Sequence, residues 1–382
     1  MNLDITQELR SIFKRYFKSE PALFFSPGRI NLIGDHTDYN MGLVLPGAID
    51  RGITVALGLS SSTRSKLIST TFHEHIEFDV NDLNPRTENH WSDYVIGVIA
   101  EIKKFTIECP QLHIVVGSDL PIGCGLSSSA ALENAISFGL NACLELQLEK
   151  IELAKIGQRT ENEHIGVESG IMDQFIGLFG KKDHLILLDC QALHHKLLKW
   201  PFTDVEIVLV NSKVRRELVD SQFNKRRQSC FQVAKACGKH SLREVNIELL
   251  ENNKHKISKN DLRKARFVLE ENQRVHKSGE SIESADISTL GKAMVDSHAG
   301  LRDKYNVSCP ELDFLVDQAL KQPEVLGSRM MGGGFGGCTI NLIKRSTFRE
   351  FRKSISQSYE TKFQKTCDLY SVNLSDGTHQ IQ

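Results

Sequence analysis

Three features that would mark other protein classes are absent from this chain of 382 residues. No apolar stretch approaches the length of about 20 residues that a membrane-spanning helix needs. The first ten residues carry acids without an apolar segment, so we expect no signal peptide. The formal net charge is only −1, which gives no basic surplus for nucleic acid. We therefore expect neither a membrane nor a nucleic-acid partner.

The nine cysteines form no C-x-x-C pair and have no zinc-finger spacing to histidine. Scattered, unpaired cysteines are typical of a reducing compartment, so we expect a cytoplasmic protein. The histidine pairs His73/His75 and His194/His195 lack the spacing or the context of metal ligands. We expect both pairs to lie on the surface.

Two nucleotide-binding signatures are also missing. The chain contains no G-x-x-x-x-G-K-[ST] sequence, and it contains no H-R-D or D-F-G set, so it is neither a P-loop protein nor a protein kinase. Gly332, Gly334 and Gly337 satisfy G-x-G-x-x-G, but this segment runs into a strand, whereas a dinucleotide-binding loop opens a helix. A glycine loop packed closely against a ligand is the better interpretation.

The composition is that of an ordinary globular protein, with 40% hydrophobic and 25% charged residues. Apolar runs predict strands near 112–116 and 204–210. A long charged segment predicts a helix over 214–239, and a polar, helix-prone segment predicts helices within 254–297. The order of these elements is mixed, without regular βαβ alternation, so we predict an α+β fold. A break near residues 190–205 predicts two domains, 1–195 and 196–382.

A glycine- and serine-rich segment, Leu120 to Ala130, follows the first predicted strand and precedes a helix-compatible run. Such a loop points free backbone N–H groups and the positive end of the helix dipole at a ligand, which favours phosphate. Gly123 and Gly125 allow close approach, and Ser127, Ser128 and Ser129 offer hydroxyls to phosphate or to Mg²⁺. A serine-rich helix cap explains the same residues equally well.

Two further segments concentrate charged residues among apolar ones. Arg29, Asp35, His36 and Asp38 lie within ten residues, and these groups suit hydrogen bonds to a polyol. A structural Arg–Asp pair in a polar loop is the slightly favoured alternative on residue types alone.

The other charged segment runs from Glu161 to Gln174. Gly170 permits close approach just before Asp173, which is a candidate general base or hydroxyl-orienting group. Glu161 is a candidate Mg²⁺ ligand together with a serine and a phosphate. The alternative is that Glu161 and Glu163 are exposed helix residues.

In sequence order, these segments resemble the motifs of the GHMP kinases, the small-molecule kinases named for galactose, homoserine, mevalonate and phosphomevalonate. Within that family the resemblance is to the galactokinase branch. It implies a two-domain α+β fold with the active site in the cleft between domains. It also implies transfer of the ATP γ-phosphoryl group to the C1 hydroxyl of galactose, and the motifs that carry it are Gly28 to Asn40, Gly123 to Ala130, Gly170 to Gln174 and Gly332 to Cys338.

The resemblance also implies roles for single residues. Asp173 is the base or orients the hydroxyl, and Arg29 stabilises the transferring phosphoryl charge. Ser129 and Glu161 match the Mg²⁺ ligands. The ATP-binding positions are Ser69, Trp91, Gly123, Cys124, Gly125, Leu126, Ser127, Ser128 and Ser129. The sugar-binding positions are Asp35, His36, Thr37, Asp38, Gly170, Asp173 and Phe223.

Two departures from the galactokinase pattern leave the sugar open. Asp35 stands where these kinases usually carry glutamate, and Phe223 stands where they commonly carry a sugar-contacting tyrosine. A phenylalanine there is similar to the N-acetylgalactosamine kinases, so another galactose-like sugar is an alternative substrate. A non-catalytic sensor of galactose and ATP is a second alternative, but the uninterrupted Ser127 to Ala131 segment argues against it. The family is often monomeric, and we expect a monomer.

Overall fold

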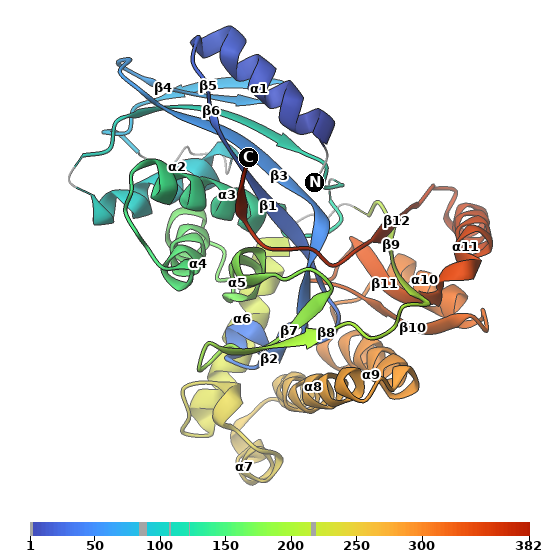
Figure 1. Cartoon of the computed structure of the whole chain (residues 1–382). Helices are drawn as coiled ribbons and strands as arrows, with labels where there is room; N and C mark the ends of the chain where they lie inside the picture. Colours follow the sequence, from blue (N-terminus) through green and yellow to red (C-terminus); the bar gives the residue numbers. More distant parts are fainter. Residues whose placement is uncertain (1–2, 84–89, 107, 122, 215–218) are drawn as a thin grey trace.

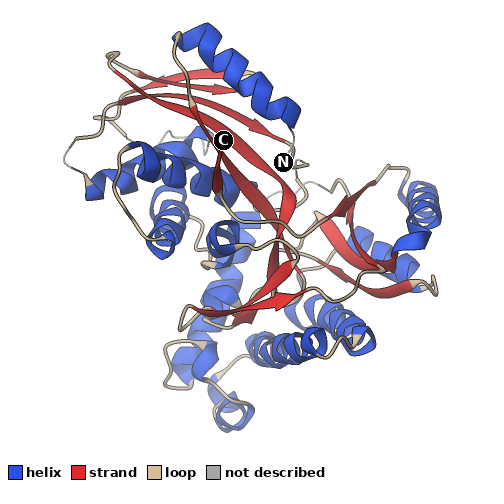
Figure 2. Ribbon diagram, viewed as in Figure 1, coloured by secondary structure: helices blue, strands red, loops and turns tan. Residues whose placement is uncertain are grey.

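The computed structural model describes residues 3–83, 90–106, 108–121, 123–214 and 219–382. Its strands form three sheets, with helices packed on their faces and between them (Figure 2). Within these ranges, no helix is long and apolar enough to cross a membrane.

The largest sheet has six strands and joins the two ends of the described chain. Its strand order is β13 (His379–Ile381), β1 (Ala22–Asn31), β3 (Pro46–Ser60), β6 (Gln111–Ser118), β4 (Ser65–Ser69) and β5 (Glu74–Phe78). Neighbouring strands are antiparallel except for β4 and β6, which are parallel. The last strand of the chain therefore pairs with the first.

Helices cover both faces of this sheet, because successive side chains of a strand point to opposite faces. On one face, Leu23 of β1 packs with Leu9 and Phe13 of α1 (Leu3–Phe17). On the other, Phe24 meets Phe138 of α3 (Ser128–Cys143) with ring centroids 6.2 Å apart. The helices α2 (Ser92–Ile102), α4 (Lys150–Arg159) and α5 (Met172–Phe179) pack around α3 (Figure 1).

The second sheet has four strands in the order β10 (Val325–Met330), β11 (Cys338–Lys344), β9 (Val205–Asn211) and β12 (Asp368–Val372). Its central strand β9 alternates in the same way. Val208 and Val210 pack with α10 (Pro310–Leu320) and α11 (Phe348–Phe363). Ile207 and Leu209 face the main core, to which α9 (Ile287–Gly300) contributes.

The third sheet is small and consists of β2 (Leu43–Val44), β7 (His184–Asp189) and β8 (His194–Lys199). The helix α8 (Lys259–Glu283) packs on this sheet, and α6 (Val219–Ala236) and α7 (Ile247–Asn252) pack on α8 (Figure 1). Two single π-turns, at Thr160–Ile165 and Leu301–Tyr305, follow α4 and α9.

The predicted elements are confirmed where the structure describes them. The strand near 112–116 is part of β6, and the strand near 204–210 is β9. The helix predicted over 214–239 is α6, which is shorter, and residues 215–218 lie outside the described residues. The two histidine pairs are exposed, as predicted. The domain division at residue 195 stays a prediction, and β13 crosses it by joining the first sheet.

Candidate active site

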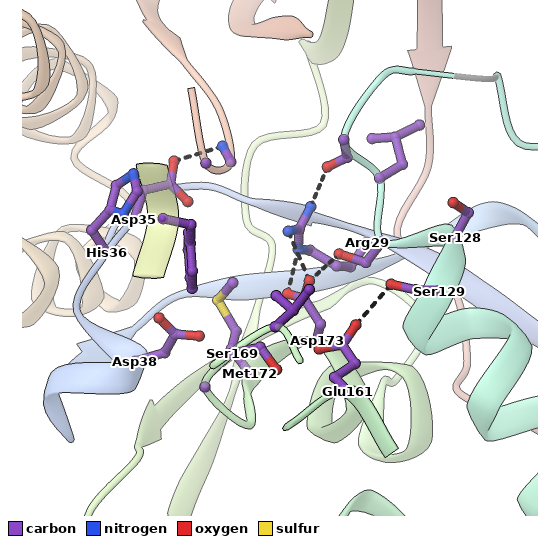
Figure 3. A pocket seen from close by; sticks show the side chains of 18 of the residues that line it. Arg29, Asp35, His36, Asp38, Ser128, Ser129, Glu161, Ser169, Met172 and Asp173 are labelled. Atoms are coloured by element: carbon purple, nitrogen blue, oxygen red, sulfur yellow. Dashed lines mark hydrogen bonds and ion pairs between the residues drawn. The ribbon is translucent and has the colours of Figure 1, made fainter. Parts of the chain in front are cut away.

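A pocket of about 350 Å³ gathers most of the site residues that the sequence predicts. Segments from both halves of the chain line it (Figure 3). We call the part lined by Asp35, His36, Asp38 and Phe223 the carboxylate end, and the part lined by Gly123, Gly125 and Leu126 to Ser129 the serine end. The lining residues are Arg29, Asp35, His36, Asp38, Leu120, Pro121, Gly123, Gly125, Leu126, Ser127, Ser128, Ser129, Glu161, Val167, Ser169, Gly170, Met172, Asp173, Phe223, Gly332 and Gly333.

The serine end owes its shape to left-handed backbone conformations. Gly123 and Gly125 have φ angles of +77° and +69°, which glycine adopts without steric cost. Ser127 is also left-handed, with φ +58°, and α3 begins at the next residue. The Ser127 side chain makes no helix-capping hydrogen bond; its hydroxyl donates to the Asp173 carboxylate. The helix-cap alternative therefore does not describe this serine.

The centre of the pocket is an ion pair between Arg29 and Asp173. The Arg29 Nε donates to Asp173 Oδ1 at 2.9 Å, and its Nη2 donates to Oδ2 at 3.1 Å. Its Nη1 donates to the Gly125 carbonyl at 2.6 Å. Two parallel bonds fix the orientation of a carboxylate more firmly than one. Arg29 therefore ties Asp173 to the loop of the serine end.

Glu161 lies beside this pair on the first π-turn. It is buried, with 8% of its surface exposed, whereas Glu163 is exposed. The exposed-helix alternative is therefore wrong for Glu161 and right for Glu163. The Ser129 hydroxyl donates to Glu161 Oε1 at 2.9 Å, and burial raises the pKa of Glu161 above its usual value. A cation bound beside a buried carboxylate offsets the cost of burying its negative charge.

Asp35 is buried at the carboxylate end, and protein groups bind both of its oxygens. Asn31 Nδ2 donates to Oδ1 at 2.7 Å, and the Gly332 N–H donates to Oδ2 at 2.9 Å. Arg329, which is fully buried, forms an ion pair with the same Oδ2. Arg329 also donates to the carbonyls of Asn31 and Leu32, at 3.1 and 3.2 Å. Asp35 thus fastens the glycine loop to the first sheet.

Asp38 lies where the carboxylate end meets the Asp173 segment. Burial, followed by the negative charge of Asp173, raises the pKa of Asp38 to about 7. A Cβ atom at Gly170 would collide with the Asp38 side chain, so a larger residue there would have to displace that carboxylate.

His36 and Phe223 complete this end. Burial lowers the pKa of His36 to about 4, so the imidazole is neutral near pH 7. The ring centroids of Phe223 and His36 lie 5.8 Å apart.

Four predicted site residues lie outside the pocket lining. The buried Thr37 hydroxyl bonds to the carbonyls of Gly34 and Leu43, and Cys124 is buried behind the loop. Ser69 accepts the N–H of Phe72, and the Trp91 ring stacks on the exposed ring of Phe72. All the other predicted site residues line the pocket together, and the four outside its lining are Thr37, Ser69, Trp91 and Cys124.

Several residues of this site have no role predicted from the sequence. Gly332 and Gly333 line the pocket, and the sequence predicts only that their loop packs against a ligand. Arg329 has no predicted role, although a charged residue directly before two methionines and a glycine run is a signal for one. Val167, Ser169 and Met172 have no signal of their own beyond their proximity to Gly170 and Asp173.

Comparison with known families defines the class of protein. Three family profiles match: the galactokinase galactose-binding signature over residues 11–59, the GHMP kinases N terminal domain over 93–181, and the GHMP kinases C terminal over 280–365. A crystal structure of mevalonate kinase shares the fold, with a TM-score of 0.67, 18% identity, and 93% of this chain and 99% of that chain covered. The fold is the two-domain α+β fold of the GHMP kinases, as predicted.

Similarity over nearly the full length narrows the class further. A galactokinase of Thermotoga petrophila is 43% identical over 357 residues, which cover 93% of this chain and 99% of that protein. A galactokinase of Roseiflexus sp. is 36% identical, with 98% and 97% covered. The crystal structure of Lactococcus lactis galactokinase complexed with galactose superposes with a TM-score of 0.95 at 35% identity, with 99% and 100% covered. The chain belongs to the galactokinase family.

Proposed function

We propose that this chain transfers the γ-phosphoryl group of ATP to the C1 hydroxyl of galactose. One observation carries the proposal: the Arg29–Asp173 ion pair lies between a polar end suited to a polyol and a loop suited to phosphate. A base and a cationic group at the meeting point of two such ends are what phosphoryl transfer requires.

Asp173 is the proposed acceptor of the C1 hydroxyl proton. The hydroxyl oxygen forms a bond to the γ-phosphorus while the bond from that phosphorus to the ADP oxygen breaks, and the proton passes to the carboxylate. Arg29 holds this carboxylate in place through two hydrogen bonds. Its guanidinium also stabilises the negative charge of the transferring group.

Mg²⁺ is the proposed cation, and Ser129 and Glu161 would hold it. Their oxygens already lie in hydrogen-bond contact, and oxygen ligands suit this ion. Among the described residues, no three His, Cys, Asp or Glu side chains gather as a metal site. A site with few protein ligands suits Mg²⁺, because this ion usually keeps several water molecules and binds substrate phosphates. When bound, it would neutralise phosphate charge.

The serine end is the proposed phosphate cradle for ATP. Gly123 is exposed, and a Cβ there would meet nothing within 4 Å, so the loop is open on that side. Free backbone N–H groups near the start of α3 are suited to phosphate oxygens. Trp91 and Ser69 remain predicted for the nucleotide side, with Phe72 stacked on Trp91 at 5.6 Å.

A kinase for another galactose-like sugar, such as N-acetylgalactosamine, is the second candidate. The observation that favours it is the state of Asp35, whose two oxygens are both bound by protein groups. Phe223 has no hydroxyl to offer a sugar. Phe223 therefore offers a substrate no hydrogen bond, and Asp35 shares both of its oxygens with protein groups.

Mg²⁺-dependent ADP release from ATP tests the proposal. The panel is galactose, N-acetylgalactosamine, arabinose, galacturonate and glucose, each over a range of concentrations. Preference for galactose supports the proposal, and preference for another sugar supports the second candidate. No release with any sugar, together with binding of ATP and galactose, would contradict both and favour a sensor.

We also propose that the protein is cytoplasmic and monomeric. All nine cysteines lie in described segments and none of them forms a disulfide, which suits a reducing compartment. Sedimentation velocity at micromolar concentration tests the oligomeric state, and a single species near 42.9 kDa is expected.

A further inference from the structure

A buried chain of hydrogen bonds runs from the carboxylate end into the helical region. His36 Nδ1 lies 2.8 Å from the Tyr39 hydroxyl, which lies 2.7 Å from the Tyr305 hydroxyl. The Tyr305 hydroxyl lies 3.3 Å from the sulfur of Cys230 on α6. All four side chains are buried, with Tyr305 fully so. Residues far apart in sequence therefore meet behind the pocket.

The four side chains of this hydrogen-bonded series are all neutral near pH 7. Burial lowers the pKa of His36 to about 4, and it raises the pKa of Cys230 to about 11. Burial also raises the pKa values of Tyr39 and Tyr305 well above the usual value for a phenol. The imidazole therefore carries one N–H, and the question is which ring nitrogen holds it.

The order of donors along the chain favours the proton on Nε2. An imidazole nitrogen is a much better acceptor than a thiol sulfur. The stronger arrangement directs the thiol at Tyr305, Tyr305 at Tyr39, and Tyr39 at His36 Nδ1. Nε2 is buried and has no hydrogen-bond partner among the described residues, although the backbone of Gly333, on the pocket wall, interacts with the ring and raises its pKa.

Hydrogen bonds to the backbone hold two members of this hydrogen-bonded series in place. His36 has a left-handed backbone, with φ +67°, and Asn40 Nδ2 donates to its carbonyl at 2.8 Å. Arg226 of α6 donates to the carbonyls of Tyr305 and Asn306, at 3.1 and 3.0 Å. The backbones of His36 and Tyr305 are thus held by side chains that lie outside the pocket lining.

We propose that Tyr39 and Tyr305 are positioning residues that fix His36 with its proton on Nε2, so that this N–H binds a hydroxyl of the sugar. The need for a donor follows from the pocket. Asp35 and the ionised form of Asp38 accept hydrogen bonds from hydroxyls, and Phe223 donates none. A sugar hydroxyl that donates a hydrogen bond to a carboxylate still has lone pairs that can accept one, and the His36 N–H would supply it. This inference rests on the proposed function.

Steady-state kinetics of Tyr39→Phe and Tyr305→Phe test it, with Tyr359→Phe as the matched control. Tyr359 is a fully buried tyrosine whose hydroxyl donates to the Ser212 carbonyl at 2.7 Å, in the core beside α11. The substrates are galactose and its 2-, 3-, 4- and 6-deoxy analogues. We expect Tyr39→Phe to raise the KM for galactose about three- to tenfold, the effect of one hydrogen bond. Tyr305→Phe should raise it less, and kcat should change little in either.

The deoxy analogues separate positioning from general loosening. With the one analogue that lacks the hydroxyl bound by His36, the effect of Tyr39→Phe on KM should fall close to onefold. An equal KM increase with galactose and with all four analogues would overturn the inference, as would no increase beyond that of Tyr359→Phe. A wild-type enzyme without galactose turnover contradicts the proposed function instead.

The tautomer of His36 provides a readout that does not depend on turnover. In ¹⁵N spectra of histidine-labelled wild-type protein, the His36 signal is identified by its loss in His36→Gln. We expect a protonated Nε2 and an unprotonated Nδ1, and a mixture of tautomers in Tyr39→Phe. A wild-type His36 protonated on Nδ1 would overturn the inference.

Discussion

At the carboxylate end, Asp35 is 2% exposed and Arg329 is fully buried, whereas Gly123 and Ser128 at the serine end are exposed. The first end is held by an ion pair and backbone bonds from segments almost 300 residues apart. The second end is one continuous segment, and its hydroxyls bind Asp173 and Glu161. One end is thus part of the core, and the other is a surface loop anchored by functional side chains.

Because of this difference, we expect the two ends to respond differently to substitution. A change at the carboxylate end removes contacts that hold the molecule together, so it should lower stability as well as sugar binding. A change at the serine end should affect nucleotide and cation use while leaving stability almost unchanged. Asp173, which Arg29 and Ser127 tie to the loop of the serine end, should affect the chemical step itself.

The largest expected effect is that of Asp173→Asn, where the two ends meet. The amide is nearly the same size, but it cannot accept the hydroxyl proton, so kcat should fall by about 10³-fold or more. ATP binding, measured by calorimetry with a non-hydrolysable analogue, should be preserved. The control is Asp204→Asn, an exposed residue outside the pocket. Turnover within tenfold of wild type would exclude Asp173 as the base.

Arg329→Met should be the most destabilising change at the carboxylate end. It leaves the buried Asp35 carboxylate without its partner, which costs about 3–5 kcal/mol of unfolding free energy. Urea unfolding measures this, with the exposed Arg345→Met as control. The double variant Arg329→Met with Asp35→Asn should recover part of the loss. If Arg329→Met and the control Arg345→Met unfold at the same urea concentration, the carboxylate end does not stabilise the fold in the way proposed.

Asp38 makes the stability of the carboxylate end depend on pH. Its pKa is about 7 in the folded chain and 3.8 as the ordinary value, so the folded state binds more protons between these values. Stability should therefore fall as pH rises from about 4 to 7. Asp38→Asn removes this cost. Its gain in unfolding free energy over wild type should grow with rising pH to a few kcal/mol, because one pKa unit corresponds to about 1.4 kcal/mol.

Urea unfolding at pH 5, 6, 7 and 8 checks the Asp38 prediction. The control is Asp204→Asn, an exposed residue outside the pocket, measured at the same four pH values. A difference between Asp38→Asn and wild type that stays constant from pH 5 to 8 would show that Asp38 ionises normally.

The smallest effect is expected from Ser129→Ala at the serine end. Loss of one proposed Mg²⁺ ligand should raise the half-saturating Mg²⁺ concentration about tenfold, the equivalent of 1.4 kcal/mol. The unfolding free energy and the KM for galactose should stay close to wild type. Ser128→Ala, the exposed neighbour, is the matched control. The same Mg²⁺ requirement in both variants would remove Ser129 from the cation site.

Much of this site could be predicted because its chemistry lies in short segments. Arg29, Asp35, His36 and Asp38 come from one stretch, and the loop from Gly123 to Ser129 comes from another. What could not be predicted is how their side chains are used. Asp35 was expected to bind a sugar directly, but its oxygens are also the anchor for Arg329 and Gly332. Thr37 closes a turn behind the pocket.

The sequence by itself determined the order of the elements, the left-handed glycines of the loop, and the family motifs, because these depend on near neighbours along the chain. Only the tertiary structure decided which distant residues meet. The pairing of Asp35 with Arg329, of Tyr39 with Tyr305, and of β13 with β1 joins segments from opposite ends. Such contacts depend on how sheets and helices pack, and the burial that shifts the pKa values of His36 and Asp38 exists only after packing.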